Sequence, residues 1–402
     1  MPAKAKKTRI VFYANCLGRG GAHQTQLAWF DLLKPVEDFE LKIFCAAEGW
    51  FAEQLRRRGL DYEILPMPRA LGLIKHGSWQ NKRRTFTRIL SMAEGLLRAW
   101  RRVALLKADI VVLTGGRDFI MLFPLAVRRR KHTVTVPQTT DWGLIPTCKF
   151  MCRMAAKTYA ISDTVAESIT AMGIAPQKVS VHPLIYTADY NGRLPAKGEI
   201  RRQLGLPLDA PILGMTGVIR PQKGQREAIL VLEEVIKRLP DARLVIVGAP
   251  PADGPDAQAY HGEIRALVDA RGLHDRVIFL GWRDDVPQVM HAMDVLLVPS
   301  HNNEGVPRVI LEGLEAGLPV LATDIPQFRE IIGKHEAGFL HPIEQISSWA
   351  DDVVQLVKFP QRLAAASKHA RSVWESLYSC ESVRPRIETA FRDLAPANGG
   401  RV

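Results

Sequence analysis

The sequence predicts an α/β protein built from two doubly wound, Rossmann-like parallel sheets. Short apolar segments of strand length alternate with amphipathic segments of helix length, and this alternation means a parallel sheet with crossover helices. The alternation stops in residues 187–211, which are rich in Gly and Pro, and then begins again. The length of 402 residues suits two domains, since a domain commonly holds roughly 100–200 residues. Two sheets side by side, with a cleft between them, are the economical interpretation.

The first half contains a complete set of alternating elements. Strands are predicted at Thr8–Ala14, Leu41–Ala46, Tyr62–Leu65, Ala108–Thr114, Thr133–Val136, Thr158–Ile161 and Lys178–His182. Helices are predicted at Ala22–Lys34, Phe51–Arg58, Phe119–Arg130, Cys148–Ala156 and from Ser162 to Met172. Ser162 is the expected N-cap of the last of these helices, because a small hydroxyl side chain can accept a hydrogen bond from a free backbone N–H there.

The second half repeats the alternation after a loop at residues 187–211. Strands are predicted at Ile212–Thr216, Arg243–Val247, Val277–Leu280, Val295–Pro299 and Val320–Thr323. Helices are predicted at Gln225–Arg238, Ala257–Arg271, Val286–Ala292, Pro307–Ala316 and from about Ser347 to the end. We therefore expect domains at residues 1–190 and 191–375, followed by a helical segment at residues 376–402.

Composition narrows the class of protein. The five cysteines lack the spacing of a zinc site and are expected to be reduced thiols. The longest apolar run, Phe119–Val127, is far shorter than the ~20 residues that span a bilayer. The basic start of the chain precedes an apolar run too short for a secretory signal. These features predict a cytoplasmic protein.

Positive charge is concentrated in the first half. Residues 1–190 contain 29 Lys and Arg against 15 Asp and Glu, whereas residues 191–402 contain 25 against 27. Within the first half, residues 69–131 interleave basic and apolar side chains, and Thr85–Leu106 has the spacing of a basic amphipathic helix. Such a helix can lie on an anionic membrane. A core-packing stripe with a solvated basic face remains the alternative, and nucleic acid is disfavoured as a partner.

The most specific motif directly follows the predicted strand Val295–Pro299. It contains Glu304, Gly305, Val306 and Pro307 ahead of a helix that carries Glu312. Pro suits the first turn of a helix, and the free N–H groups there suit a diphosphate. A carboxylate inside such a helix could bind ribose hydroxyls, as acidic residues do in dinucleotide folds.

A second motif follows strand Ile212–Thr216. Arg220 and Lys223 place two cations at the end of this strand, where they could hold the phosphates of a leaving nucleoside diphosphate. A third, weaker motif is the Gly-rich turn that includes Gly20 and Gly21 after the first strand. The ribose-binding acid of an NAD site is not clear after the second strand, which disfavours NAD.

Taken together, these motifs resemble the family 4 retaining glycosyltransferases of the GT-B fold. The resemblance is carried by Val277-Ile278-Phe279-Leu280-Gly281, the Glu304/Glu312 pair, Glu315-Ala316-Gly317-Leu318-Pro319-Val320 and Glu336-Ala337-Gly338-Phe339-Leu340, and by Arg220, Lys223 and Gly20-Gly21. It implies a GT-B fold with the acceptor bound by residues 1–190 and the nucleotide sugar by residues 191–375. The last helical segment would cross back to the N-terminal domain.

The resemblance also implies site roles. Glu304 would contact the donor sugar beside the backbone of residues 305–307, and Glu312 would bind the ribose. Arg220 and Lys223 would clamp the diphosphate, with Gly20 and Gly21 touching the phosphates from the N-terminal domain. Trp282 and Arg283 occupy the position where the family recognises the base.

The sequence departs from the family pattern on the acceptor side. His23 stands where Glu is common, and no His follows the strand that ends at Val136. Gln138 or Asp141 are the candidates to work with the acceptor hydroxyl. With no Asp-x-Asp motif in a suitable place, we expect no metal and no other cofactor.

The resulting expectation is a metal-independent, retaining glycosyltransferase. It would move a sugar from a nucleotide-diphosphate sugar, UDP- or GDP-linked, to a glycan or lipid-linked acceptor in cell-envelope polysaccharide or lipopolysaccharide assembly. A peripheral position on the inner face of the plasma membrane is left open. The alternatives are a non-catalytic binding protein of the same fold and another GT-B enzyme, an epimerase or a phosphorylase.

Overall fold

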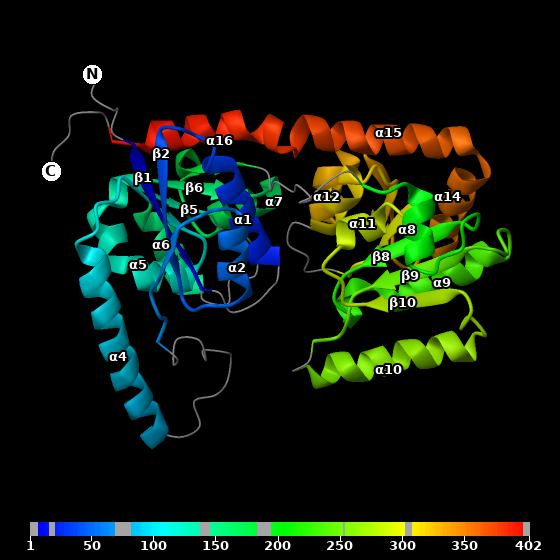
Figure 1. The fold of residues 1–402 in the computed structure, drawn as a ribbon, viewed down its shortest axis with the longest axis horizontal. Helices are drawn as coiled ribbons and strands as arrows, with labels where there is room; N and C mark the ends of the chain where they lie inside the picture. The colour runs from blue at the N-terminus through cyan, green and yellow to red at the C-terminus, as the bar shows by residue number, and fades with distance from the viewer. Residues whose placement is uncertain are drawn as a thin grey trace. The chain divides into compact units, whose positions relative to one another are not determined.

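The chain forms two compact units in a computed structural model. The first unit comprises Met1–Ile185 and Cys380–Val402, and the second comprises Tyr186–Ser379. Each unit contains one parallel sheet with helices packed around it (Figure 1). The predicted α/β class with two doubly wound sheets is confirmed. The structure describes residues 7–15, 21–68, 82–136, 145–182, 194–251, 254–301 and 308–396.

The sheet of the first unit has seven strands in the order β3-β2-β1-β4-β5-β6-β7. The strands are β1 (Thr8–Ala14), β2 (Phe39–Cys45), β3 (Tyr62–Ile64), β4 (Ile110–Leu113), β5 (Thr133–Thr135), β6 (Lys157–Ala160) and β7 (Val179–Val181). The central strands β1 and β4 are entirely apolar where they are buried, as expected for strands covered on both faces. Each strand pair is parallel, so successive strands are joined by crossover segments.

Helices of the first unit follow the predicted positions closely. They are α1 (Gly21–Leu33), α2 (Trp50–Arg57), α4 (Lys82–Ala104), α5 (Gly116–Arg128), α6 (Ile145–Met154), α7 (Asp163–Ala171) and α16 (Cys380–Leu394), with short helices η1 (Arg130–His132) and η2 (Pro176–Lys178). The Ser162 side chain accepts a hydrogen bond from the Val165 backbone N–H, which confirms the predicted N-cap.

The C-terminal helix α16 is part of the first unit. Phe391 is fully buried and its ring contacts those of Trp29 and Tyr159. The Tyr159 hydroxyl donates a hydrogen bond of 2.8 Å to the Ala390 carbonyl, and His132 Nδ1 lies 2.6 Å from the Leu394 carbonyl. The contact at Leu394 reaches a carbonyl of the last turn, which has no partner within the helix.

The sheet of the second unit has six strands in the order β10-β9-β8-β11-β12-β13. They are β8 (Ile212–Thr216), β9 (Arg243–Val247), β10 (Val277–Gly281), β11 (Val295–Val298), β12 (Val320–Thr323) and β13 (Gly338–His341). Around them lie α8 (Lys197–Gln203), η3 (Pro221–Lys223), α9 (Gln225–Ile236), α10 (Pro255–Ala270), α11 (Val286–Met290), α12 (Arg308–Glu315), α13 (Pro326–Phe328), η4 (Arg329–Gly333), α14 (Ile346–Lys358) and α15 (Pro360–Leu377).

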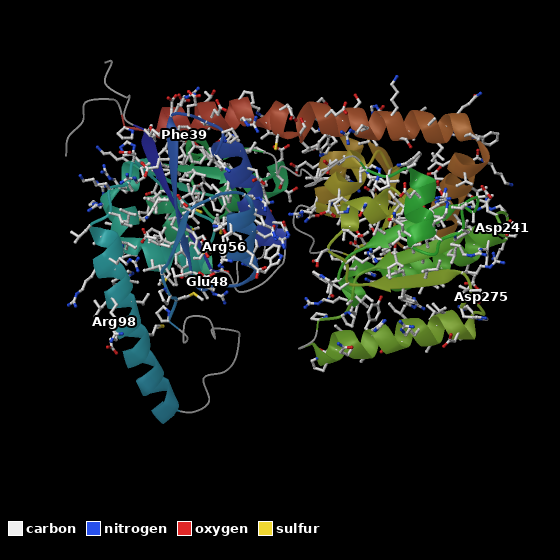
Figure 2. All side chains as sticks on the ribbon, in the orientation of Figure 1. Phe39, Glu48, Arg56, Arg98, Asp241 and Asp275 are labelled. Carbon is white, nitrogen blue, oxygen red and sulfur yellow. The ribbon has the colours of Figure 1, made fainter. Side chains whose placement is uncertain are left out.

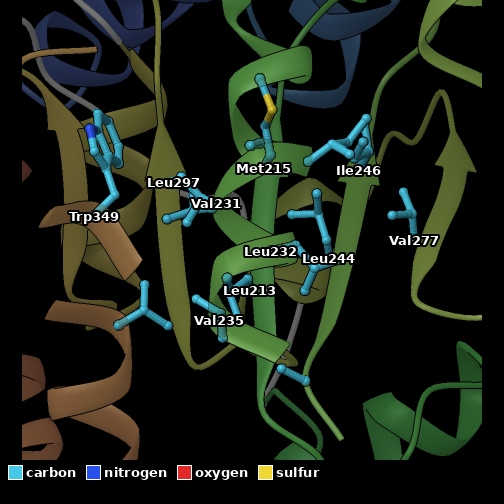
Figure 3. Close-up of a cluster of buried hydrophobic side chains, with 14 of the residues drawn as sticks. Leu213, Met215, Val231, Leu232, Val235, Leu244, Ile246, Val277, Leu297 and Trp349 are labelled. Atoms are coloured by element: carbon cyan, nitrogen blue, oxygen red, sulfur yellow. The ribbon is translucent and has the colours of Figure 1, made fainter. Parts of the chain in front are cut away.

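One aliphatic core holds α9 and α14 against this sheet. Leu213 and Leu297 from the strands meet Val231 and Val235 from α9, and Trp349 of α14 closes the cluster (Figure 3). Each of these side chains is at most 1% exposed. Fully burying a large aliphatic side chain contributes roughly 1.5–3 kcal/mol, so this cluster fixes the sheet that carries the site described below.

The predicted loop at residues 187–211 contains a helix, so that prediction was wrong in part. α8 is held by Arg201, which is 4% exposed and donates to the carbonyls of Ala292 and Leu208 and to Asp294. The Asp294 carboxylate also accepts from the backbone N–H of Ile212 at 2.7 Å. These tertiary contacts stabilise a short helix that local sequence does not predict.

Charged side chains cover the outside of both units. Arg98 projects from α4 of the first unit, and Asp241 and Asp275 lie just before β9 and β10 at the edge where these strands begin (Figure 2). None of the described helices combines the length and the apolar composition that crossing a bilayer requires.

Candidate nucleotide-binding site

The carboxyl ends of β8 and β11 define the candidate site. These strands are parallel neighbours, but the chain leaves β8 toward β9 and leaves β11 toward β12 on the opposite side. Their loops therefore diverge at this point of the sheet. Such a switch point is where open α/β sheets bind ligands.

The loop after β8, Gly217–Gly224, is fixed by backbone contacts. The Gly217 N–H donates to the Val247 carbonyl at 2.9 Å, and the Ile219 N–H donates to the Ala249 carbonyl at 3.2 Å. Gly224 has φ +74°, and a Cβ there would lie 1.8 Å from the Pro299 carbonyl oxygen. Only glycine fits such a position, so the loop is tightly seated against the end of β11.

This loop presents the two predicted cations. Arg220 is exposed, and among the described residues it has no ion-pair partner. Lys223 is half-buried, with its methylene groups beside Gly217. Beneath the loop, the fully buried Gln225 donates a hydrogen bond of 3.1 Å from Nε2 to the Val218 carbonyl. The arrangement offers positive charge on a preorganised loop, which suits an anion such as a diphosphate.

The end of β11 is tied to the same loop. Ser300 is 2% exposed, and the backbone N–H of His301 donates to the Gln222 carbonyl at 2.9 Å. The His301 ring also lies 3.4 Å from the Glu227 carboxylate on the first turn of α9. Sequence reasoning missed this pair because 74 positions separate the two residues. Residues 302–307, with the predicted Glu304, Gly305, Val306 and Pro307, lie outside the described part of the chain.

Glu312 lies on α12, the helix that follows this segment. Its carboxylate accepts a hydrogen bond of 3.1 Å from Arg308 Nη2, and the two side chains are 15% and 19% exposed. Arg308 precedes Glu312 by one turn, and this i,i+4 spacing is a local signal from which the pair could have been predicted. The acid expected to bind ribose is therefore partly buried and already oriented by a neighbour.

The predicted base-recognition residues follow β10. Trp282 is 56% exposed, and its indole N–H donates to Asp284 at 3.3 Å. Arg283 donates two hydrogen bonds to Asp285, at 2.7 and 2.6 Å, and these bonds lower the pKa of the Asp285 carboxyl. The Trp282 indole is thus exposed at this position, whereas the Arg283 guanidinium is paired with Asp285.

The first unit presents different chemistry at the carboxyl ends of β1 and β4. His23 Nε2 lies 3.0 Å from Asn15 Oδ1, and burial lowers the pKa of this imidazole. After β4, Asp118 is 2% exposed and accepts from the backbone N–H of Thr114; burial raises its pKa to about 6. Gly21 is the first residue of α1. The predicted Gly20, Gln138 and Asp141 lie outside the described residues.

No metal site is evident in the part of the chain that the structure describes, since His, Cys, Asp and Glu nowhere gather there in threes.

Two doubly wound sheets, with a cationic loop at the switch point of the second, define an α/β protein with a candidate anion site. Residues 196–373 of the second unit match the family model described as glycosyl transferases group 1. The matched range runs from α8 into α15 and includes Arg220, Lys223 and Glu312.

Two curated relatives are similar to part of this chain. The chain is 29% identical over 228 residues to 2-deoxystreptamine glucosyltransferase of Streptomyces kanamyceticus, covering 56% of this chain and 57% of the relative. It is 28% identical over 200 residues to the lipopolysaccharide core biosynthesis mannosyltransferase LpsB of Rhizobium meliloti, covering 49% of this chain and 56% of the relative. The chain thus spans a little over half the length of these curated relatives.

The crystal structure of Anabaena Alr3699/HepE in complex with UDP and glucose has a similar fold. Its TM-score is 0.76, at 19% identity, over 96% of this chain and 99% of that one. The fold of this protein is therefore that of the GT-B glycosyltransferases, as the sequence resemblance predicts.

Proposed function

We propose that the protein is a retaining glycosyltransferase that uses a nucleotide-diphosphate sugar as donor and needs no metal. The observation that carries the proposal is the fixed loop Gly217–Gly224, which presents Arg220 and Lys223 at the switch point of the second sheet. A departing nucleoside diphosphate needs its negative charge stabilised in the transition state, and preoriented cations supply that stabilisation without a bound ion.

The remaining donor contacts follow from their positions around this loop. Glu312, one turn after Arg308, binds the ribose hydroxyls, and Trp282 covers the base. Glu304 and the backbone of residues 305–307 contact the sugar, as the resemblance implies. Because UDP is bound in the similar Anabaena structure, UDP-sugars are the donors to test first, together with GDP-sugars.

The reaction we propose keeps the configuration of the transferred sugar. The acceptor hydroxyl attacks from the face that the diphosphate leaves, and a phosphate oxygen receives the proton of that hydroxyl. Arg220 and Lys223 then stabilise the charge that builds up on the phosphate. Gln138 or Asp141 would orient the acceptor.

The acceptor we propose is a glycan or a lipid-linked glycan of the cell envelope, bound by the first unit at a cytoplasmic membrane face. Three side chains support membrane contact: Leu97 and Leu105 are 52% and 85% exposed, and Arg101 lies between them at i,i+4 spacing on the same face of α4 and its end. The opposite face of α4 packs inward through Ala99 and Val103, which are at most 4% exposed. The helix therefore has both a core-packing face and an exposed mixed face.

The first experiment is a donor screen with the full chain. Thermal shift and sugar-nucleotide hydrolysis are measured against UDP-, GDP-, ADP- and TDP-sugars, with and without chelator. We expect one base to stabilise the protein, with equal shifts in chelator. Loss of the shift in chelator would overturn metal independence. No shift with any donor would favour the non-catalytic binding protein, and liposomes and nucleic acid would be tested next.

Glu312→Gln tests the ribose assignment in the same screen. The substitution keeps size and Arg308 contact but removes the charge, so we expect roughly tenfold weaker binding of the preferred nucleoside diphosphate. The 2′-deoxy form of that nucleotide should bind the variant and the parent protein with similar affinity. If the variant lost its affinity for both forms completely, Glu312 would act by stabilising α12 and not by binding the ribose.

A further inference from the structure

A histidine and a buried carboxylate lie beside the cationic loop, and no role above uses them. His301 Nε2 is 3.4 Å from Glu227 Oε1. The Glu227 side chain is 15% exposed and that of His301 is 45% exposed. The imidazole thus lies between an acid in the protein interior and the solvent in front of the switch point.

The carboxylate lacks the donors that a buried charge needs. Glu227 Oε2 is buried and has no hydrogen-bond partner among the described residues. A buried acceptor without a donor is costly, and more so when it is charged. The 3.4 Å contact is longer than the ~2.7–2.9 Å of a charge-assisted hydrogen bond, so a proton gained by His301 could shorten and strengthen it.

His301 is also fixed against the segment that carries the cations. Its backbone N–H donates to Gln222, which lies between Arg220 and Lys223. The other ring nitrogen, Nδ1, belongs to a side chain that is 45% exposed. When both ring nitrogens carry protons, one can face Glu227 while the other faces an anion on the loop.

The other charged or titratable groups around the pair are already in one state near neutral pH. Arg220 and Lys223 on the loop and Arg226 on α9 are cations there. The Tyr260 hydroxyl accepts from the Arg226 backbone N–H at 3.4 Å, and burial raises its pKa to about 12, so it stays neutral. Histidine is the residue type that changes charge most readily in this range.

We infer that His301 takes up a proton when a nucleoside diphosphate binds the loop after β8, and that the imidazolium, held by Glu227, becomes a third cationic contact for the diphosphate. The inference rests on the proposed function, which places the diphosphate at Arg220 and Lys223. A bound anion favours the charged form of an imidazole beside it, and the Glu227 carboxylate favours that form from the other side. The proton comes from the buffer, and only the ring N–H bond forms.

The test is titration calorimetry of the full chain with UDP and with GDP, at about pH 8, in buffers of different ionisation heat. The dependence of the measured heat on the buffer gives the number of protons taken up on binding. We expect a clear fraction of a proton for the parent protein. In His301→Gln that uptake should disappear and the affinity should fall several-fold. Glu227→Gln should lower both in the same direction.

His274→Gln is the matched control. His274 Nε2 lies 3.1 Å from Asp275 in the same unit, but just before β10, at the opposite edge of the sheet. Its removal should leave proton uptake and affinity unchanged. Protons released by the nucleotide itself are the same in all variants, so differences between proteins report on the ring.

The outcomes separate the two proposals. If UDP or GDP binds with equal proton uptake in the parent and in His301→Gln, the inference is wrong and the donor site stands. If neither diphosphate binds the parent protein, the proposed function fails and the inference fails with it. Should Glu227→Gln not fold, the comparison of His301→Gln with His274→Gln still decides the result.

Discussion

The first and second units order their central strands in the same way, yet they differ at the carboxyl ends of those strands. In the second unit, the loop after β8 is seated on β11 and presents Arg220 and Lys223. In the first unit, β1 is followed by the half-buried Asn15–His23 pair, and the positive charge lies instead on exposed helices such as α4. The same topology therefore supports a fixed cationic loop in one unit and a broad basic surface in the other.

Each unit also uses a buried glutamine to hold the helix after its first strand. Gln26 donates to the Tyr13 carbonyl at 2.9 Å, and Gln225 donates to the Val218 carbonyl at 3.1 Å. Only in the second unit does the accepting carbonyl belong to the cationic loop. The comparison indicates that the same type of buried glutamine hydrogen bond contacts a strand in the first unit and the loop of the candidate site in the second.

The largest expected effect comes from removing both cations of the loop. Each charge-assisted hydrogen bond contributes about 1.5–3 kcal/mol, so Arg220→Ala and Lys223→Ala should each weaken nucleoside diphosphate binding by roughly 10–100-fold, and more together. Calorimetry with UDP and GDP measures the affinity. Arg238→Ala is the control, since this exposed arginine pairs with Asp351 at the far end of α9. If the control matches the double variant, net charge and not the loop binds the diphosphate.

A smaller but sharper effect is expected when the seating of the loop is disturbed. Gly224→Ala places a methyl group 1.8 Å from the Pro299 carbonyl oxygen, in a left-handed conformation with φ +74°. Gly272→Ala places alanine in the same left-handed conformation, φ +64°, but its Cβ would have no atom within 4 Å. The control should lose only roughly 1–2 kcal/mol of stability, the cost of placing alanine in that conformation, and should bind UDP normally. Gly224→Ala should lose more stability and also bind UDP more weakly, because the loop must move away from β11.

Equal thermal unfolding and equal UDP affinity in these two glycine variants would mean that the loop adapts without cost and that its contact with Pro299 does not organise the site.

The candidate site of the second unit could be proposed from the sequence because its residues lie close together along the chain. Arg220, Lys223 and Glu312 follow a strand or open a helix within a few positions, and strands β1, β8, β9 and β12 were predicted to the residue. α8 escaped prediction because it depends on the distant partners of Arg201. β13 was missed because four residues carry little periodicity, although Gly338 is required where a Cβ would lie 2.3 Å from the Val320 carbonyl oxygen.

The pairs that link distant segments could not be predicted in this way. His301 meets Glu227 and Tyr159 meets Ala390 only after the sheets have formed. The spacing of residues along the chain does not reveal such contacts. For the proposed acceptor unit, the sequence therefore predicts a basic surface but not which residues would bind the acceptor.

A moderate effect of pH should distinguish two buried groups of the first unit. Burial lowers the pKa of His182 to about 4 and raises that of Asp118 to about 6. As the pH falls from about 6.5 to 4, the unfolded chain binds a proton at His182 and the folded chain does not, so stability falls. As the pH falls through about 6, the folded chain binds a proton at Asp118 before the unfolded chain does, so stability rises.

Between pH 7 and pH 5 each contribution is about 1–2 kcal/mol and the two are opposite in sign, so they nearly cancel in the parent protein. Urea unfolding at both pH values should therefore show steeper acid destabilisation in Asp118→Asn and a gain of stability on acidification in His182→Gln. If both variants follow the parent curve, neither group titrates differently in the folded chain, and the buried polar groups of the first unit are stability elements without pH dependence.

The smallest expected effect concerns the exposed face of α4, and it tests whether the basic half of the comparison is a membrane surface. Leu97→Ser and Leu105→Ser remove exposed apolar area while leaving every positive charge in place. On vesicles containing anionic lipid, binding should fall several-fold in the double variant, because apolar insertion adds to electrostatic attraction. Leu208→Ser, at an exposed leucine of the second unit, should change nothing. UDP affinity should be equal in the parent protein and the double variant, because Leu97 and Leu105 belong to the first unit and the loop after β8 belongs to the second. If the double variant binds vesicles like the parent, the attraction is charge alone, and the positive charge of the first unit then fits an anionic acceptor as well as it fits a membrane.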